Sequence, residues 1–105
     1  MLRGRIYRAR LTHIGEDTFF LVVSNNRRNR AFGQVLAARL TTTPPRSERA
    51  ALVPLGHDEV MTGWVSCDDI ETLYHDEVRA DLGAVTPASM RRVEAGLHAA
   101  FGMAE

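Results

Sequence analysis

The chain has 105 residues, of which 45% are apolar, and this composition excludes a disordered protein and predicts one domain over residues 1–105. The formal net charge is zero, yet residues 1–50 carry ten arginines against three acidic residues, and residues 51–105 carry three against ten. A basic half of this kind is typical of proteins that bind a polyanion. No apolar run is long enough to span a membrane and the single cysteine, Cys67, excludes an internal disulfide, so we expect a cytoplasmic protein.

Short strands separated by turn residues are predicted from residue 5 onward. Residues 5–11 alternate, with three side chains on each face of a strand. Residues 18–24 are apolar on both faces, which indicates a central, buried strand. Further strands are expected at residues 34–42, 50–55 and 63–67, the last continuing through residues 70–73 after a bend. A series of short strands is typical of a small barrel.

An amphipathic helix is predicted near the C-terminus, over residues 87–101. Thr86 is a good N-cap, and Pro87 suits the first helical position. Apolar residues then recur at steps of three and four, and Gly102 is a natural stop. The sequence therefore predicts a mainly β fold of the α+β class, in which a small barrel is followed by one C-terminal amphipathic helix.

Arginines gather around the second and third expected strands. Arg39 and Thr41 lie on one face of the strand 34–42, because side chains two residues apart in a strand point the same way. Five more arginines follow the strand ends: Arg27, Arg28, Arg30, Arg46 and Arg49. If these strands are neighbours, the side chains can converge on one groove that holds a phosphate backbone. A charged edge that protects a sheet from aggregation, or a GC-rich genome that favours arginine codons, explains the same pattern.

Other chemistry-bearing residues favour structural interpretations. The tetrapeptide His-Asp-Glu-Val occurs at residues 57–60 and 75–78, but its spacing does not suit a metal site, so we expect two polar turns. Cys67 precedes two aspartates, which do not activate a thiol, and we expect it in the core. Trp64 and Phe32 are expected in the core or an interface, with stacking on bases as the alternative. We expect no metal and no cofactor.

Five segments, in a fixed order along the chain, carry a resemblance to a known family. They are Arg3-Gly4-Arg5-Ile6-Tyr7, Leu21-Val22-Val23-Ser24-Asn25, Leu40-Thr41, Cys67-Asp68-Asp69-Ile70-Glu71-Thr72, and Leu82-Gly83 with Val85-Thr86 before the final helix. In these segments, and over nearly its whole length, the chain resembles the MazF/PemK toxins of bacterial toxin–antitoxin systems.

This resemblance implies a fold, an activity and partners. The implied fold is an SH3-like barrel with helices that forms a homodimer. The implied activity is that of a metal-independent, sequence-specific endoribonuclease, which cuts RNA to a 2′,3′-cyclic phosphate and a 5′-OH. The implied partner, besides RNA, is a cognate antitoxin whose disordered C-terminal segment covers the RNA groove.

The resemblance also implies residues of the active site. Thr41 falls on the family's strand-end threonine, Asp68 on an acidic position of the segment that begins at Cys67, and His13 in the first hairpin loop. With Arg39 these are the expected catalytic residues: Arg39 and Thr41 would hold the phosphate, and Asp68 or His13 would move protons. The expected RNA-binding residues form a second set: Asn25, Arg27, Arg28, Arg30 and Arg46.

The resemblance implies two arginines that this chain replaces: one near Thr18-Phe19, at the start of the second strand, and one, present in some relatives, at Ser66. A further arginine that it implies, in the segment that begins at Cys67, is Glu71 here. A phosphoryl transition state needs a cation close by, so Arg39 is the expected substitute and Arg27 is the next candidate.

Two other functions fit the sequence. The related CcdB toxins use the same barrel to poison DNA gyrase through the C-terminal helix, although the last residues of this chain contain no tryptophan. A degenerate toxin would bind RNA or an antitoxin without cutting, and the replaced arginines favour that alternative.

Overall fold

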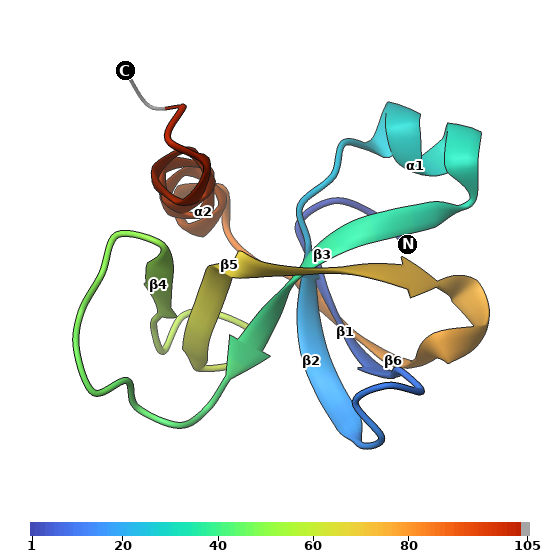
Figure 1. Cartoon of the computed structure of the whole chain (residues 1–105), viewed down its shortest axis with the longest axis horizontal. Helices are drawn as coiled ribbons and strands as arrows, with labels where there is room; N and C mark the ends of the chain where they lie inside the picture. Colours follow the sequence, from blue (N-terminus) through green and yellow to red (C-terminus); the bar gives the residue numbers. More distant parts are fainter. Residues whose placement is uncertain (104–105) are drawn as a thin grey trace.

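The structure, a computed structural model, describes residues 1–103 and contains one antiparallel sheet and two α-helices (Figure 1). The strands are β1 (Arg5–Arg10), β2 (Asp17–Val22), β3 (Gln34–Thr41), β4 (Leu52–Leu55), β5 (Gly63–Tyr74) and β6 (Val78–Ala84). The helices are α1 (Asn26–Phe32) and α2 (Pro87–Phe101), and a short 3₁₀ turn covers His75–Glu77. None of the described helices is long and apolar enough to cross a membrane.

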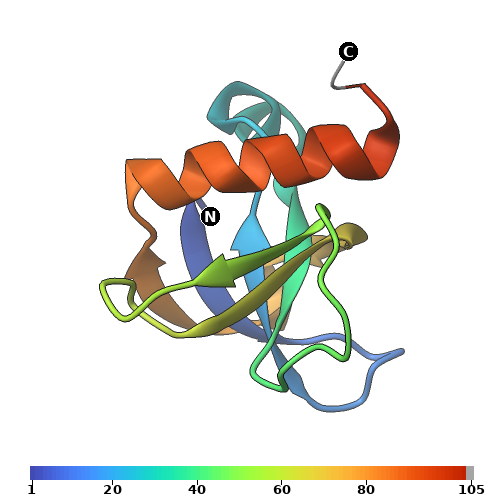
Figure 2. The ribbon, with the colours of Figure 1, turned by 90° about the vertical axis from the view of Figure 1, so that its left-hand side faces the viewer.

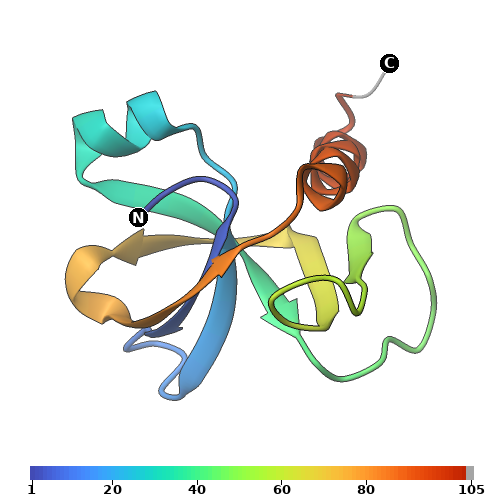
Figure 3. The same cartoon turned by 180° about the vertical axis from the view of Figure 1, so that it is seen from behind.

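The six strands form a single strongly bent sheet in the order β4-β5-β3-β2-β1-β6 (Figures 1 and 3). The expected mainly β fold is confirmed, and α2 begins and ends where the sequence predicts, with the Thr86 side chain accepting from the Ser89 N–H and Gly102 in the left-handed conformation. β6 was not predicted, because its half-buried residues give only a weak apolar alternation.

Two apolar clusters lie on the two faces of the sheet, and β3 contributes to both. Ala38 belongs to the cluster under α2, which includes Ile6, Leu21 and Val65. Ala37 belongs to the cluster on the other face, formed mostly by β1, β2 and β3. α2 contributes Val93 to the first cluster, and Figure 2 shows this helix lying across the strands of the sheet. β3 is therefore a rigid central element, because burial fixes its backbone on both faces.

β5 bends as it crosses β3, as expected from its two aspartates. Ala38 of β3 pairs with Ile70, whereas the next residue, Arg39, pairs with Ser66. The three residues of β5 between these partners form a bulge. Within it, the Cys67 N–H donates to the Ala51 carbonyl, next to β4, and not to β3. The bend lets the first half of β5 pair with β4 while its second half continues along β3.

The strand expected over residues 18–24 ends at Val22, and α1 follows it. Three asparagines build this helix: Asn25 caps it by accepting from the Arg28 N–H at 2.8 Å, and Asn26 accepts from the Arg3 N–H at 2.8 Å. The buried Asn29 accepts from the Ser24 hydroxyl at 2.5 Å and donates to the Ser24 carbonyl at 3.0 Å. Asn29 is the only buried residue of α1, so the helix has no apolar stripe by which a sequence pattern could reveal it.

Candidate functional site

The C-terminal end of β3 lines an open cavity of about 220 Å³, which we call the strand-end cavity. β3 and the residue beyond it contribute Arg39, Leu40, Thr41 and Thr42 to the lining, and the end of the first hairpin and the start of β2 contribute Glu16, Asp17, Thr18 and Phe19. Within residues 1–103 the Arg39 guanidinium has no ion pair with a carboxylate. The structure therefore brings Arg39 and Thr41 together, with the cation free to bind an anion.

An acidic residue at the rim of this cavity is already neutralised. Asp17 lies 3.4 Å from Arg8 and 3.8 Å from Arg10 in two ion pairs. These contacts reduce the repulsion that Asp17 would otherwise exert on an anion beside Arg39.

Two positions at which the sequence resemblance implies an arginine lie on either side of Arg39. Thr18 lines the strand-end cavity, and Ser66 is the direct partner of Arg39 in the β3–β5 register. Directly opposed residues of an antiparallel pair point to the same face, with Cβ atoms roughly 4.5–5.5 Å apart. Arg39 is thus the arginine of this chain that lies between the two positions.

His13 contacts the carboxylate of Glu71, a position that the sequence marks only by the absence of an expected arginine. Its Nε2 lies 3.1 Å from Glu71 Oε1. Glu71 is opposite Ala37 in the β3–β5 register, on the face of β3 that also carries Arg39. The replacement of arginine by glutamate was therefore the signal, because a carboxylate at this position can orient a histidine that an arginine would repel.

Asp68 lies apart from this pair and does not line the strand-end cavity. Its two carboxylate oxygens each accept from Arg49, at 3.3 Å, so Asp68 holds an arginine of the loop between β3 and β4. Both side chains are about half exposed, at 42% and 51%. The structure thus gives Asp68 a partner of its own, away from Arg39 and Thr41.

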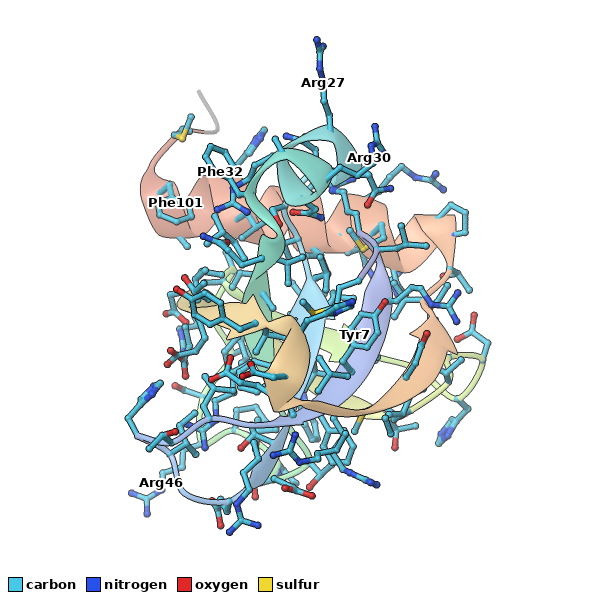
Figure 4. The ribbon with its side chains drawn as sticks, turned by 90° about the vertical axis from the view of Figure 1, so that its right-hand side faces the viewer. Tyr7, Arg27, Arg30, Phe32, Arg46 and Phe101 are labelled. Carbon is cyan, nitrogen blue, oxygen red and sulfur yellow. The ribbon has the colours of Figure 1, made fainter. Side chains whose placement is uncertain are left out.

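The expectation that all the arginines converge on one groove is wrong within a single chain. Figure 4 shows Arg27 and Arg30 on α1 at one end of the molecule and Arg46 at the opposite end. α1 precedes the first residue of β3, and Arg39 lies five residues further along, which at about 3.3 Å per residue is roughly 17 Å. The cause is the antiparallel pairing of β2 and β3, which places the end of β2, and α1 after it, at the start of β3 and away from its end.

Arg28 is committed to α1 itself. Its guanidinium donates to the carbonyl and side-chain oxygens of Gln34, at 3.0 and 2.9 Å, and lies 5.1 Å from the centre of the Phe32 ring. These contacts close the helix onto the start of β3, so Arg28 stabilises the turn at Gly33 in addition to carrying charge.

Cys67 is fully buried under α2, as expected for a core residue. Burial first, and then the negative charge of Asp68, raise the pKa of its thiol to about 11. Within residues 1–103 no three His, Cys, Asp or Glu side chains are grouped so as to hold a metal ion. The first of the repeated tetrapeptides instead supplies Glu59, which accepts from Thr86 and Ser89 at the start of α2.

Comparison with known proteins gives the family of this chain. Residues 2–101 match the family described as PemK-like, MazF-like toxin of type II toxin-antitoxin system. Endoribonuclease MazF1 of Mycobacterium bovis and endoribonuclease MazF4 of Mycobacterium tuberculosis are each 43% identical over 102 residues, which cover 97% of this chain and 93% of the relative.

Solved structures agree with this match. A mycobacterial endoribonuclease in complex with its cognate antitoxin has a TM-score of 0.90 at 42% identity, covering 100% of this chain and 98% of that chain. The Mycobacterium tuberculosis toxin MazF-mt6 shares the fold, with a TM-score of 0.80 at 19% identity over 96% of this chain and 99% of that chain. The resemblance found in the sequence is confirmed: the chain belongs to the PemK-like, MazF-like endoribonuclease toxins of type II toxin–antitoxin systems.

Proposed function

We propose that the protein cuts single-stranded RNA at the strand-end cavity, by attack of a ribose 2′-OH on the neighbouring phosphate. The new bond joins O2′ to phosphorus, the bond from phosphorus to O5′ breaks, and the products are a 2′,3′-cyclic phosphate and a 5′-OH. The observation that carries this proposal is that Arg39, whose guanidinium has no carboxylate partner among residues 1–103, lines one open cavity together with the Thr41 hydroxyl. The family assignment favours this activity over the gyrase-poisoning alternative.

Arg39 and Thr41 bind the scissile phosphate in this mechanism. As the 2′ oxygen attacks, negative charge builds on the non-bridging oxygens of the phosphate, and a fixed guanidinium stabilises that charge. The Thr41 hydroxyl donates to one of these oxygens and fixes their orientation. In this proposal Arg39 supplies the cation that the resemblance implies at the positions of Thr18 and Ser66, because it lies between the two.

His13 is the proton acceptor in this proposal, and its support is the contact with Glu71 on the face of the sheet that carries Arg39. A general base has to accept the 2′-OH proton, and arginine cannot, since its pKa stays above about 12. Glu71 holds the imidazole at 3.1 Å and stabilises the positive charge that it gains with the proton. The departing 5′ oxygen takes a proton from water. Asp68 has a different role in this proposal, because its carboxylate orients Arg49.

The partners that we propose are RNA, a cognate antitoxin and a second copy of this chain. Exposed arginines outside the cavity, Arg27, Arg30 and Arg46, contact the RNA backbone beyond the cut site (Figure 4). A homodimer is supported by two phenylalanines that remain largely exposed in the single chain, Phe32 at 68% and Phe101 at 63%. The antitoxin is proposed because the solved relative at 42% identity is a complex with its cognate antitoxin.

Primer extension on a long single-stranded RNA tests the proposed function. The purified protein is incubated with the RNA in EDTA, and the cut ends are mapped and then treated with acid, which opens a cyclic phosphate. Discrete cuts with cyclic ends, lost in Arg39→Ala and strongly reduced in Thr41→Ala, are expected. Arg79→Ala, a change in an exposed arginine of β6 whose guanidinium binds the backbone of the 3₁₀ turn, is the matched control.

Two results would contradict the proposal. Cuts that survive in Arg39→Ala and Thr41→Ala would move the active site elsewhere in the chain. An absence of cuts on mRNA, rRNA and tRNA, with tight RNA binding retained, would leave a toxin that binds RNA without cleaving it.

A further inference from the structure

A larger cavity, of about 450 Å³, lies next to Trp64, and we call it the Trp64 cavity. Its apolar lining comes from Trp64, Pro54 and Leu52 on the sheet and from Pro45 in the loop that follows β3. Two charged side chains, Arg49 and Glu48, complete it. None of the proposed catalytic residues lines this cavity, so the cutting mechanism leaves it without a function.

The Trp64 cavity is connected to the strand-end cavity. A third cavity, of about 350 Å³, shares Thr42 with the strand-end cavity and shares Trp64 and Pro54 with the Trp64 cavity. Trp64 is also the direct partner of Thr41 in the β3–β5 register, so the two side chains are on one face with Cβ atoms roughly 4.5–5.5 Å apart. A chain that is held by its phosphate at Arg39 and Thr41 can therefore continue past Trp64.

The lining matches the chemistry of one nucleotide. A half-buried indole and two prolines offer flat apolar surface on which a base can stack. The Arg49 guanidinium, which Asp68 holds at 3.3 Å, is a positioned cation for an adjoining phosphate. The carboxylate of Glu48 accepts hydrogen bonds, as the exocyclic amino group of a base donates them. The cavity volume also lies in the range of about 300–1,000 Å³ that is usual for small-molecule sites.

We propose that the Trp64 cavity is a specificity subsite, which binds one base of the RNA next to the cut. Trp64 stacks on the base, Glu48 accepts from an amino group at its edge, and Arg49 binds the phosphate beside it. This inference rests on the proposed function, since the strand-end cavity fixes the register of the RNA. It adds that the protein selects a base with an amino group at one position adjoining the cut.

A base fits this cavity better than an apolar segment of a protein partner. An apolar side chain would fill the space between the prolines and the indole, but it would offer no hydrogen bond to the charged groups of Arg49 and Glu48. A nucleotide satisfies all three kinds of surface, because it has a flat face, a polar edge and a phosphate. Because neighbouring cavities with shared lining residues join this cavity to that of Arg39 and Thr41, one RNA molecule can occupy both.

Cleavage of an RNA pool with random sequence tests the subsite. Wild-type protein, Trp64→Ala, Trp64→Phe and Tyr74→Ala are compared by sequencing the cut ends. Tyr74 is the matched control, because it is an exposed aromatic residue at the other end of β5. Trp64→Ala is expected to lose the preference at one position beside the cut and to lower kcat/KM roughly 5- to 150-fold, the equivalent of one stacked base. Trp64→Phe keeps the preference, and Tyr74→Ala matches the wild type.

Fluorescence gives a second test that does not depend on cleavage. Trp64 is the only tryptophan of the chain, so the intrinsic emission of the protein reports on this cavity alone. A single-stranded oligonucleotide with deoxyribose at every position cannot be cut by 2′-OH attack and serves as the probe. Saturable quenching of the emission is expected, stronger for oligonucleotides of adenine or cytosine than of thymine.

The outcomes separate this inference from the proposed function. Normal cutting by Trp64→Ala with an unchanged sequence preference would overturn the subsite and leave the function intact. If the wild type cuts no RNA, the function fails, and the quenching experiment still decides the subsite. Quenching by an antitoxin peptide and not by oligonucleotides would assign the cavity to the antitoxin and overturn the proposal. Thermal unfolding of each variant verifies that its fold is retained.

Discussion

β3 begins and ends near arginines, and the two groups differ in what their side chains contact. At its start, Arg28 is bound to Gln34 and to the Phe32 ring, and the neighbouring asparagines cap and anchor α1. At its end, Arg39 has no carboxylate partner within residues 1–103 and shares a cavity with Thr41. The comparison teaches that the density of arginine along a sequence does not locate the site. A cation is available for chemistry where the fold leaves it unpartnered beside an open cavity.

The largest effect separating the two ends is expected from Arg39→Ala. Loss of one preorganised donor to a developing oxyanion lowers the rate about 10²- to 10³-fold. Single-turnover cleavage of an end-labelled RNA measures the loss. Arg39→Lys, which keeps the charge without the planar fork, is expected to recover part of the rate. A rate within threefold of wild type for Arg39→Ala would show that the end of β3 is no different from its start.

At the other end of β3, Asn29→Ala is expected to affect stability and not the chemistry. The change leaves the buried Ser24 hydroxyl and carbonyl without the partners that Asn29 supplies. An unsatisfied buried polar group costs about 1–3 kcal/mol, and urea unfolding measures that cost. Arg30→Ala, at the exposed next position, is the control for stability. The comparison would break if Asn29→Ala unfolded normally but no longer cut RNA at saturating substrate.

Acid titration sharpens the comparison, because it separates loss of fold from loss of the site. Burial opposes ionisation of Glu59, but hydrogen bonds from Ser89 and Thr86 outweigh it and hold its pKa below the ordinary 4.5. A lowered folded-state pKa contributes stability that is complete above about pH 4.5 and is lost as the pH falls through the folded value.

Glu59→Gln is therefore expected to lower the free energy of unfolding at pH 7 by about 1 kcal/mol, and this difference is expected to shrink as the pH falls below about 4.5. Asp58→Asn, a change of the neighbouring exposed acid, is the control. A difference between wild type and Glu59→Gln that persists undiminished at pH 3 would rule out this linkage.

The smallest effect is expected from Arg27→Ala. If Arg27 contacts only the RNA backbone, the variant keeps its maximal rate and its binding weakens equally for all sequences. Each lost phosphate contact lowers the slope of log K against log salt by about 0.7 for single strands. Fluorescence anisotropy at several salt concentrations measures this slope. A drop in the maximal rate would show that α1 takes part in the reaction, and the start and the end of β3 would then not differ in function.

Much of the fold could be predicted because its signals are local. Thr86, Pro87 and Gly102 mark the ends of α2, and the apolar spacing between them marks its buried face. α1 could not be predicted, because it has no buried apolar stripe and is held by asparagine contacts that depend on residues distant in the sequence, such as Arg3. Hydrophobic periodicity cannot reveal a helix of this kind.

The candidate site divides in the same way. The two-residue period of a strand was enough to place Arg39 beside Thr41. The partner of His13 was not predictable, because it depends on the register between β3 and β5 and on the bulge that shifts it. For the same reason Glu71 was interpreted as a missing arginine, although its carboxylate lies 3.1 Å from the imidazole.

The buried thiol of Cys67 makes the molecule well suited to labelling. It is the only thiol of the chain, and with a pKa of about 11 it reacts slowly with maleimides near neutral pH while the protein stays folded. A cysteine introduced at an exposed position, such as Ala31 on α1 or Thr43 beyond β3, would then carry a spin label or fluorophore at one known place. With one label at each end of β3, distances from both labels to a bound nucleic acid can be measured in solution, and these distances give its path along the strand.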